Sequence, residues 1–161
     1  MPEKIKVALV GLGNCFSGLI QGIEYYSKNP SQKVTGIIHE NLRDYTIHDI
    51  EFVAGFDVGA NKIGKPINEA IYESPNMVDW IDKNDMPKAN GNVYESPALD
   101  GVGIWVENKV KPIESGKSES ELREEIIKVL EETGTEIIVS YLPVGSEKAT
   151  QFWAKVCLDT N

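Results

Sequence analysis

The residues Ile5-Lys6-Val7-Ala8-Leu9-Val10-Gly11-Leu12-Gly13 set the architecture expected of this chain. The first six are mostly apolar and rich in β-branched side chains, which is typical of a strand buried in a parallel sheet. Two glycines then end the strand. From Cys15 onward, apolar side chains recur at helical spacing until Asn29-Pro30, where the helix is expected to end. The segment therefore predicts a strand, a glycine turn and a helix.

Two more strands are predicted further along the chain, at Ile50 to Phe56 and at Ile137 to Leu142. A helix between them follows Ser118 and Glu121, whose spacing is that of a capping box, and it is expected to end at Gly134. Strands that alternate with helices favour a parallel sheet, because parallel neighbours need a crossover connection. We expect an α/β fold of Rossmann type, with a mainly parallel sheet and helices on both faces.

The length of 161 residues suits one domain with a hydrophobic core. We expect residues 1–161 to form a dinucleotide-binding domain with insertions at about 33–50 and 66–116. No stretch reaches the roughly 18 consecutive apolar residues of a membrane span, and no signal-peptide pattern is present, so we expect a cytoplasmic protein without membrane association. The net charge of -9 and the scattered lysines argue against nucleic acid as a partner.

The cysteines and histidines are expected to have structural roles only. Cys15 and Cys157 lie far apart and fit no metal-ligand spacing, so we expect both to be buried small apolar residues and predict no metal site. His39 and His48 do not follow a predicted strand, and we assign neither of them to catalysis.

The turn after the first strand has the features of a phosphate-binding site. Gly11 and Gly13 leave the backbone open to a phosphate pair, and the amino terminus of the next helix offers N–H groups and a favourable dipole. Asn14 and Ser17 add hydrogen-bonding groups. The third glycine of the usual G-x-G-x-x-G motif would fall at Phe16, so the motif is incomplete. A plain tight turn is the alternative, but the flanking strand and helix favour phosphate binding.

Asp57 is expected at the carboxyl end of the second predicted strand. A carboxylate there can accept hydrogen bonds from an adenosine ribose, and it repels the 2′-phosphate of NADP, so it favours NAD. Asp57 lies 44 residues after Gly13, whereas the usual spacing is about 20 residues. The segment 33–50 would account for the difference. A surface aspartate that caps a turn is the competing interpretation.

Three features converge on one edge of the predicted sheet: Gly11 to Ser17, Asp57, and Ser140 to Ser146. Ligands of open parallel sheets bind at the carboxyl ends of the strands, so we expect these residues to line one crevice. Ser140 and Ser146 have no base nearby in the sequence. A polar lining or a helix cap is therefore favoured over nucleophilic catalysis.

Five segments of the chain, taken in order, resemble the prokaryotic form of L-myo-inositol-1-phosphate synthase. The resemblance covers most of the chain and is far more specific than a glycine motif. The segments are Val7 to Cys15, Gln21 to Tyr26, Asp49 to Val58, Leu99 to Gly103 and Val139 to Glu147.

The resemblance implies an enzyme that converts glucose 6-phosphate to inositol 1-phosphate with tightly held NAD. The sugar is oxidised, cyclised by an intramolecular aldol step and reduced again, and the family's enzymes are homotetramers. The resemblance also implies which residues surround the pyrophosphate, which one holds the adenosine ribose and which line the dinucleotide cleft. They are Gly11, Gly13, Asn14 and Cys15 for the pyrophosphate, Asp57 for the ribose, and Ser140, Leu142, Pro143, Gly145 and Ser146 for the cleft.

The family's catalytic lysines come after the segment that Val139 to Glu147 resembles, in a region that also completes the sheet and forms the oligomer. Since this chain ends at Asn161, we assign it no catalytic residue and expect it to be inactive alone. We also expect an open sheet edge and a lack of packing partners for Phe152 and Trp153. The alternatives are a noncatalytic NAD-binding module and the front half of another nicotinamide oxidoreductase.

Overall fold

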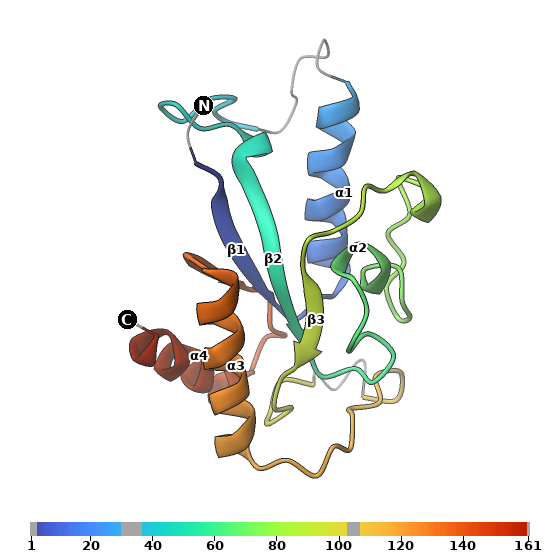
Figure 1. Cartoon of the computed structure of the whole chain (residues 1–161). Coiled ribbons are helices and arrows are strands. Elements are labelled where there is room, and N and C mark those ends of the chain that lie inside the picture. The colour runs from blue at the N-terminus through green and yellow to red at the C-terminus, as the bar shows by residue number, and fades with distance from the viewer. Residues whose placement is uncertain (1–2, 30–36, 103–106, 161) are drawn as a thin grey trace.

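The structure of the chain, a computed structural model, describes residues 3–29, 37–102 and 107–160. It contains a sheet of four strands in the order β3-β2-β1-β4, and every pair of neighbours is parallel. In Figure 1 the arrowhead of β3 points toward the lower edge of the sheet, where β1 and β2 also end. The strands are β1 (Ile5–Val10), β2 (Ile50–Asp57), β3 (Asn92–Glu95) and β4 (Ile137–Ser140). The predicted α/β fold with a parallel sheet is confirmed.

Helices cover both faces of the sheet, as predicted (Figure 1). One face packs against α1 (Asn14–Lys28) and α2 (Ile67–Ala70), and the other against α3 (Glu119–Thr133) and α4 (Glu147–Asp159). Two short 3-10 helices, η1 (Ile47–Asp49) and η2 (Lys83–Asp85), lie in the connections. No helix in the described part of the chain is long and apolar enough to cross a membrane.

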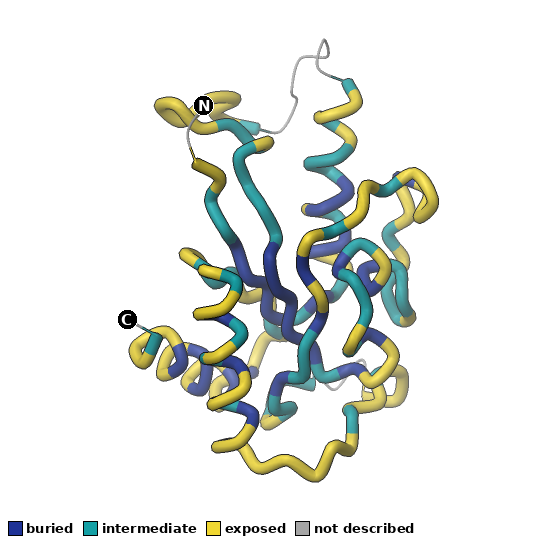
Figure 2. Tube along the Cα trace, viewed as in Figure 1, coloured by how far each residue is buried: buried dark blue, intermediate teal, exposed yellow. Residues whose placement is uncertain are grey.

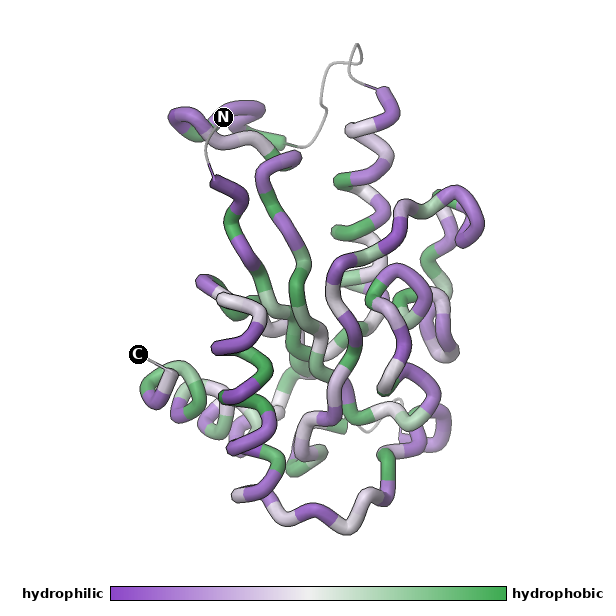
Figure 3. Tube along the Cα trace, in the orientation of Figure 1, coloured by the Kyte–Doolittle hydropathy of each residue, from purple (hydrophilic) through white to green (hydrophobic). Residues whose placement is uncertain are grey.

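The central strand β1 supplies side chains to the cores on both faces. Val7 and Leu9 belong to the core that α1 covers, whereas Ala8 and Val10 belong to the core that α3 and α4 cover. This alternation follows from the two-residue period of a strand. The lower halves of β1 and β2 are the buried centre of the molecule in Figure 2, and Figure 3 shows the same segments as hydrophobic. A strand buried on both faces has no polar side, which explains its almost continuous apolar sequence.

The ends of α3 confirm the signals read from the sequence. The Ser118 hydroxyl accepts a hydrogen bond from the N–H of Glu121 at 3.3 Å, and the Glu121 carboxylate accepts one from the N–H of Ser118 at 2.8 Å. At the other end, Gly134 has a φ of 63°, a left-handed conformation that glycine adopts without steric cost.

The strand β3 is absent from the sequence-based prediction. It has four residues, begins with a polar residue and ends with another, and so lacks the apolar run that marked the other strands. It lies within the stretch 66–116 that we expected to be an insertion, yet it pairs with β2. Part of that stretch therefore belongs to the sheet. The strand β4 ends at Ser140, two residues before the predicted end at Leu142.

Two predictions about burial are wrong. Cys15 and Cys157 are both exposed, because each lies one residue away from the buried stripe of its helix and a helix turns by about 100° per residue. Phe152 and Trp153 do have packing partners, since both are buried and the ring centroids of Trp153 and Phe56 are 4.9 Å apart. β4 is an edge strand among the described residues, and Ile137 at its start is exposed.

Candidate functional site

A crevice of about 210 Å³ opens at the carboxyl ends of the strands, next to the turn that follows β1. β1 is also the strand at which the chain changes direction across the sheet, and such switch points are where open α/β sheets bind ligands. Six of the predicted cofactor-binding residues line the crevice, namely Gly11, Gly13, Asn14, Asp57, Leu142 and Pro143. The turn after β1, the end of β2 and the segment after β4 are therefore brought together.

The other four predicted residues, Cys15, Ser140, Gly145 and Ser146, do not line the crevice. Cys15, Ser140 and Gly145 are exposed. Ser146 is buried at the start of α4, where its hydroxyl donates a hydrogen bond to the carbonyl oxygen of Pro143 at 2.6 Å. Ser146 occupies the N-cap position of α4, but its side chain makes no capping hydrogen bond there, so neither the cleft lining nor the helix cap describes its role.

Gly11 and Gly13 differ in whether the fold itself requires a glycine at the position. Gly11 has a φ of +81°, a backbone conformation that favours glycine, whereas a Cβ there would make only an ordinary contact of 3.4 Å with the carbonyl oxygen of Tyr141. Gly13 has an extended conformation with a φ of -81°, and a Cβ there would meet nothing within 4 Å. The fold does not require glycine at position 13. The open space in front of its Cα belongs to the crevice.

The amino terminus of α1 is open toward this crevice. Its N-cap, Gly13, provides no side-chain hydrogen bond, and its first turn contains no acidic residue. The side chain of Asn14 instead accepts a hydrogen bond from the N–H of Met77 at 2.8 Å, which ties the segment after α2 to the turn. The first N–H groups of an uncapped helix and the positive end of its dipole attract an anion.

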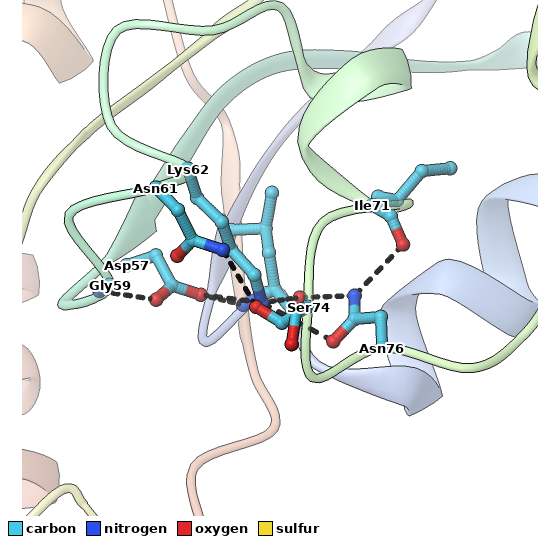
Figure 4. A network of polar contacts seen from close by, with 8 residues as sticks. Asp57, Gly59, Asn61, Lys62, Ile71, Ser74 and Asn76 are labelled. Carbon is cyan, nitrogen blue, oxygen red and sulfur yellow. Dashed lines mark hydrogen bonds and ion pairs between the residues drawn. The ribbon is translucent and has the colours of Figure 1, made fainter. Parts of the chain in front are cut away.

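Asp57 lies at the end of β2, as predicted, and its carboxylate is buried next to the glycine turn (Figure 4). Its Oδ2 accepts a hydrogen bond from the N–H of Leu12 at 2.8 Å, and its Oδ1 accepts one from the N–H of Gly59 at 2.8 Å. Because an ionised carboxylate has about four acceptor positions, these two bonds leave acceptor capacity for a ligand. Asp57 therefore has a structural role in addition to any contact it makes with a ligand.

Lys62 is buried beside Asp57, although nothing in the sequence distinguished it from a surface lysine. Lys62 is only 4% exposed. The ammonium lies 2.7 Å from the carbonyl oxygen of Leu12, 3.3 Å from Oδ1 of Asn76 and 3.6 Å from Oδ2 of Asp57. These three oxygen atoms match the three donors of a lysine. The pairing is needed, because burial of an unpaired ammonium is strongly unfavourable.

Leu12, the middle residue of the turn, is held through both of its backbone polar groups. Its N–H donates to Asp57, and its carbonyl oxygen accepts hydrogen bonds from Lys62 and from Nδ2 of Asn76, the latter at 2.9 Å. Nδ2 of Asn76 also donates to the carbonyl oxygen of Ile71 at 2.9 Å. The contacts visible in Figure 4 therefore fix the glycine turn without a ligand.

Asp100 attaches the segment after β3 to the amino terminus of α4. Its Oδ2 accepts a hydrogen bond from the N–H of Lys148 at 2.8 Å, and its Oδ1 accepts one from the N–H of Ala149 at 2.9 Å. These bonds, led by the one from Lys148, lower the pKa of the Asp100 carboxyl group. Ala98 and Gly101 on the same segment line the crevice. Asp100 thus fixes one wall of the site.

Neither histidine lines the crevice. His48 belongs to η1, which directly precedes β2 and therefore lies at the opposite edge of the sheet, and its Nδ1 is 3.0 Å from the Ser27 hydroxyl. His39 is exposed in the connection before η1. In the described ranges, no group of three or more histidine, cysteine or acidic residues is arranged to hold a metal ion.

The chain is similar in sequence to curated bacterial enzymes. Inositol-3-phosphate synthase from Mycolicibacterium smegmatis is 39% identical over 97% of this chain, and that from Corynebacterium glutamicum is 40% identical over 96% of it. The chain spans 41% of the length of each of these relatives. No protein-family profile matches it.

Two solved structures are similar over 98% of the chain. The crystal structure of Ari2 superimposes with a TM-score of 0.77 at 25% identity, and the match covers 44% of that protein. A myo-inositol-1-phosphate synthase-related protein from Thermotoga maritima has the same fold, with a TM-score of 0.74 at 20% identity over 45% of its length. Over nearly its whole length, the chain is therefore homologous to the amino-terminal region of inositol-3-phosphate synthases.

Proposed function

We propose that this chain binds NAD in the crevice and forms the cofactor-binding part of an inositol-3-phosphate synthase. The observation that carries the proposal is the uncapped amino terminus of α1, which follows a glycine with open space in front of it and lines a crevice at the switch point of the sheet. Backbone N–H groups and bare glycine together suit a pyrophosphate. The names of the relatives support the choice of reaction.

The residues of the crevice fit the parts of such a dinucleotide. Gly11, Gly13 and Asn14 would surround the pyrophosphate, and Asp57 would accept hydrogen bonds from the adenosine ribose through its remaining acceptor positions. Leu142 and Pro143 would add an apolar wall. Cys15, Ser140, Gly145 and Ser146 would not contact the cofactor, because they lie outside the crevice.

In the whole enzyme we propose glucose 6-phosphate as the substrate and a homo-oligomer as the assembly. NAD, when bound, supplies reversible hydride transfer. The role of this chain is to bind and orient NAD, since the catalytic lysines implied by the resemblance match none of its residues. The purified chain, supplied with NAD and glucose 6-phosphate, should accordingly produce no inositol phosphate. Measured turnover would move the chemistry to residues that we describe as structural.

Cofactor binding can be tested directly by calorimetry and by thermal unfolding of the purified chain. A ligand at a hundredfold excess over its Kd stabilises the folded state by about 2.7 kcal/mol, so NAD should raise the Tm measurably. NADP should raise the Tm less, because the Asp57 carboxylate repels the 2′-phosphate, although the ammonium of Lys62 beside it reduces the size of this difference. Adenosine alone, which lacks the pyrophosphate, serves as the control. Failure of millimolar NAD to shift the Tm or to give a binding isotherm would contradict the proposal.

A further inference from the structure

We propose that Lys62 determines how strongly the crevice discriminates NAD from NADP. The inference rests on the proposed function, because it concerns the same crevice and the same class of cofactor. It adds a residue that acts on selectivity without being one of the glycine-turn or ribose-binding positions expected from the sequence.

The proposal starts from the charge next to the expected ribose position. Asp57 and Lys62 both line the crevice, both are buried, and their charged groups are 3.6 Å apart. Seen from the crevice, they form an ion pair and not an isolated carboxylate. Opposite charges at this separation largely cancel at longer range, so the field that reaches a ligand is far weaker than that of Asp57 alone.

This pairing changes what Asp57 implies for selectivity. The 2′-phosphate of NADP adds negative charge that NAD lacks, and a lone carboxylate would repel it. The ammonium of Lys62 attracts the same charge. Lys62 therefore reduces the preference for NAD that the carboxylate would otherwise impose, and the balance between the two side chains sets the ratio of the two affinities.

Lys62 also has a second effect, which the experiment must separate from the first. By donating to the carbonyl oxygen of Leu12, it helps to fix the glycine turn. The turn would contact the pyrophosphate, which NAD and NADP share. A loosened turn therefore weakens the binding of both cofactors by the same factor. The ratio of the two dissociation constants is insensitive to that common loss and reports the charge effect.

The test is calorimetric titration of the 161-residue chain with NAD and with NADP at low ionic strength. Lys62→Met, which is close in volume, should raise the ratio of the NADP Kd to the NAD Kd by about threefold to tenfold, the effect of one uncompensated charge near a partly hydrated phosphate. Asp57→Asn should lower the ratio by a similar factor. The double variant should return it toward the wild-type value, an outcome that a purely structural role of Lys62 does not produce.

Lys65→Met is the matched control. It removes the same charge three positions along the chain, but Lys65 is partly exposed, pairs with Glu73 at 2.7 Å and does not line the crevice. The ratio of the NADP Kd to the NAD Kd should be the same in Lys65→Met as in the wild type. If Lys62→Met does not fold, Lys62→Gln keeps a donor for the Leu12 carbonyl without the charge, and it should raise the ratio in the same direction.

The result that overturns the inference is an unchanged ratio in the neutral Lys62 variants while both affinities fall together. A shift of equal size in Lys65→Met would also overturn it, since net charge would then explain the effect. If the wild-type chain binds neither cofactor, the proposed function itself fails. The two failures can be told apart. The inference alone fails when the wild-type chain binds the cofactors but the ratio of the dissociation constants does not change in the Lys62 variants.

Discussion

Two of the helices that begin at the carboxyl edge of the sheet, α1 and α4, have amino termini that differ in whether their first N–H groups are already bonded. At α1 no side chain caps the helix, and the crevice lies in front of it. At α4 the N–H groups of Lys148 and Ala149 already bond to both oxygens of Asp100. Both termini could attract a phosphate by their dipoles. Only α1 has first-turn N–H groups that are available to a phosphate.

The difference shows that the position of a turn at the carboxyl edge of the sheet is not sufficient to identify a ligand contact. Both turns were expected to contribute to the cofactor site, because both follow parallel strands. In the structure, the turn after β1 supplies Gly11, Gly13 and Asn14 to the crevice, whereas the turn before α4 contributes Pro143 but not Gly145 or Ser146. An internal carboxylate has taken the place that a ligand anion would occupy at α4.

The largest effect should come from filling the space in front of α1. Gly13→Ala places a methyl group in the crevice where the pyrophosphate is expected, and such a clash should weaken NAD binding by about tenfold to a hundredfold. Loss of glycine as N-cap should cost about 1 kcal/mol of stability or less. Calorimetry and chemical denaturation measure the two effects separately.

Gly22→Ala is the control for this change. It lies inside α1, and a Cβ there also meets nothing within 4 Å, but Gly22 does not line the crevice. It should leave NAD affinity unaltered and raise stability slightly, because alanine favours a helix more than glycine does. Equal NAD affinity in Gly13→Ala and the wild type would mean that the cofactor does not approach this turn.

A smaller effect is expected from uncapping α4. Asp100→Ala removes both carboxylate contacts, so the Tm should fall by several degrees, as for the loss of an N-cap. NAD affinity should change less than in Gly13→Ala, because Asp100 acts only through the crevice wall. Asp100→Asn, which keeps one acceptor oxygen, should be intermediate. Tighter binding of inorganic phosphate by Asp100→Ala than by the wild type would show that α4 also offers a usable anion site.

The smallest effect should appear in the pH dependence of stability. The N–H groups of α4 lower the pKa of Asp100 in the folded state, so its contribution is present above the unfolded pKa of about 3.9 and is lost as the pH falls through the lower folded value. Urea denaturation between about pH 6 and about pH 3 should therefore show a steeper loss of stability for the wild type than for Asp100→Asn. Parallel curves would mean that Asp100 is not held by α4 in solution.

Local patterns were sufficient for the elements whose causes are local. The apolar run of β1, the paired glycines after it, and the Ser118 and Glu121 capping box each act within a few residues, and the structure confirms all three. The position of Asp57 at the end of β2 followed from the strand pattern in the same way.

What could not be predicted depends on contacts between distant parts of the chain. Lys62 is buried only because Leu12, Asn76 and Asp57 surround its ammonium. Asp100 caps a helix that begins 47 residues later. β3 is short and partly polar, and it becomes a strand by pairing with β2. Sequence spacing carries no signal for the contacts of Lys62 and Asp100, and in β3 the strand-favouring pair Val93 and Tyr94 is too short, between Asn92 and Glu95, to mark a strand.

The way in which Leu12 is held also has a kinetic consequence. A loop that must order itself around a ligand slows association and reduces affinity by the entropy of ordering. Here three side chains secure the backbone of the turn before a ligand arrives. Cofactor association should therefore be a single step whose observed rate rises linearly with cofactor concentration, without a slower rearrangement. Variants that weaken the crevice contacts should then differ mainly in how fast the cofactor leaves.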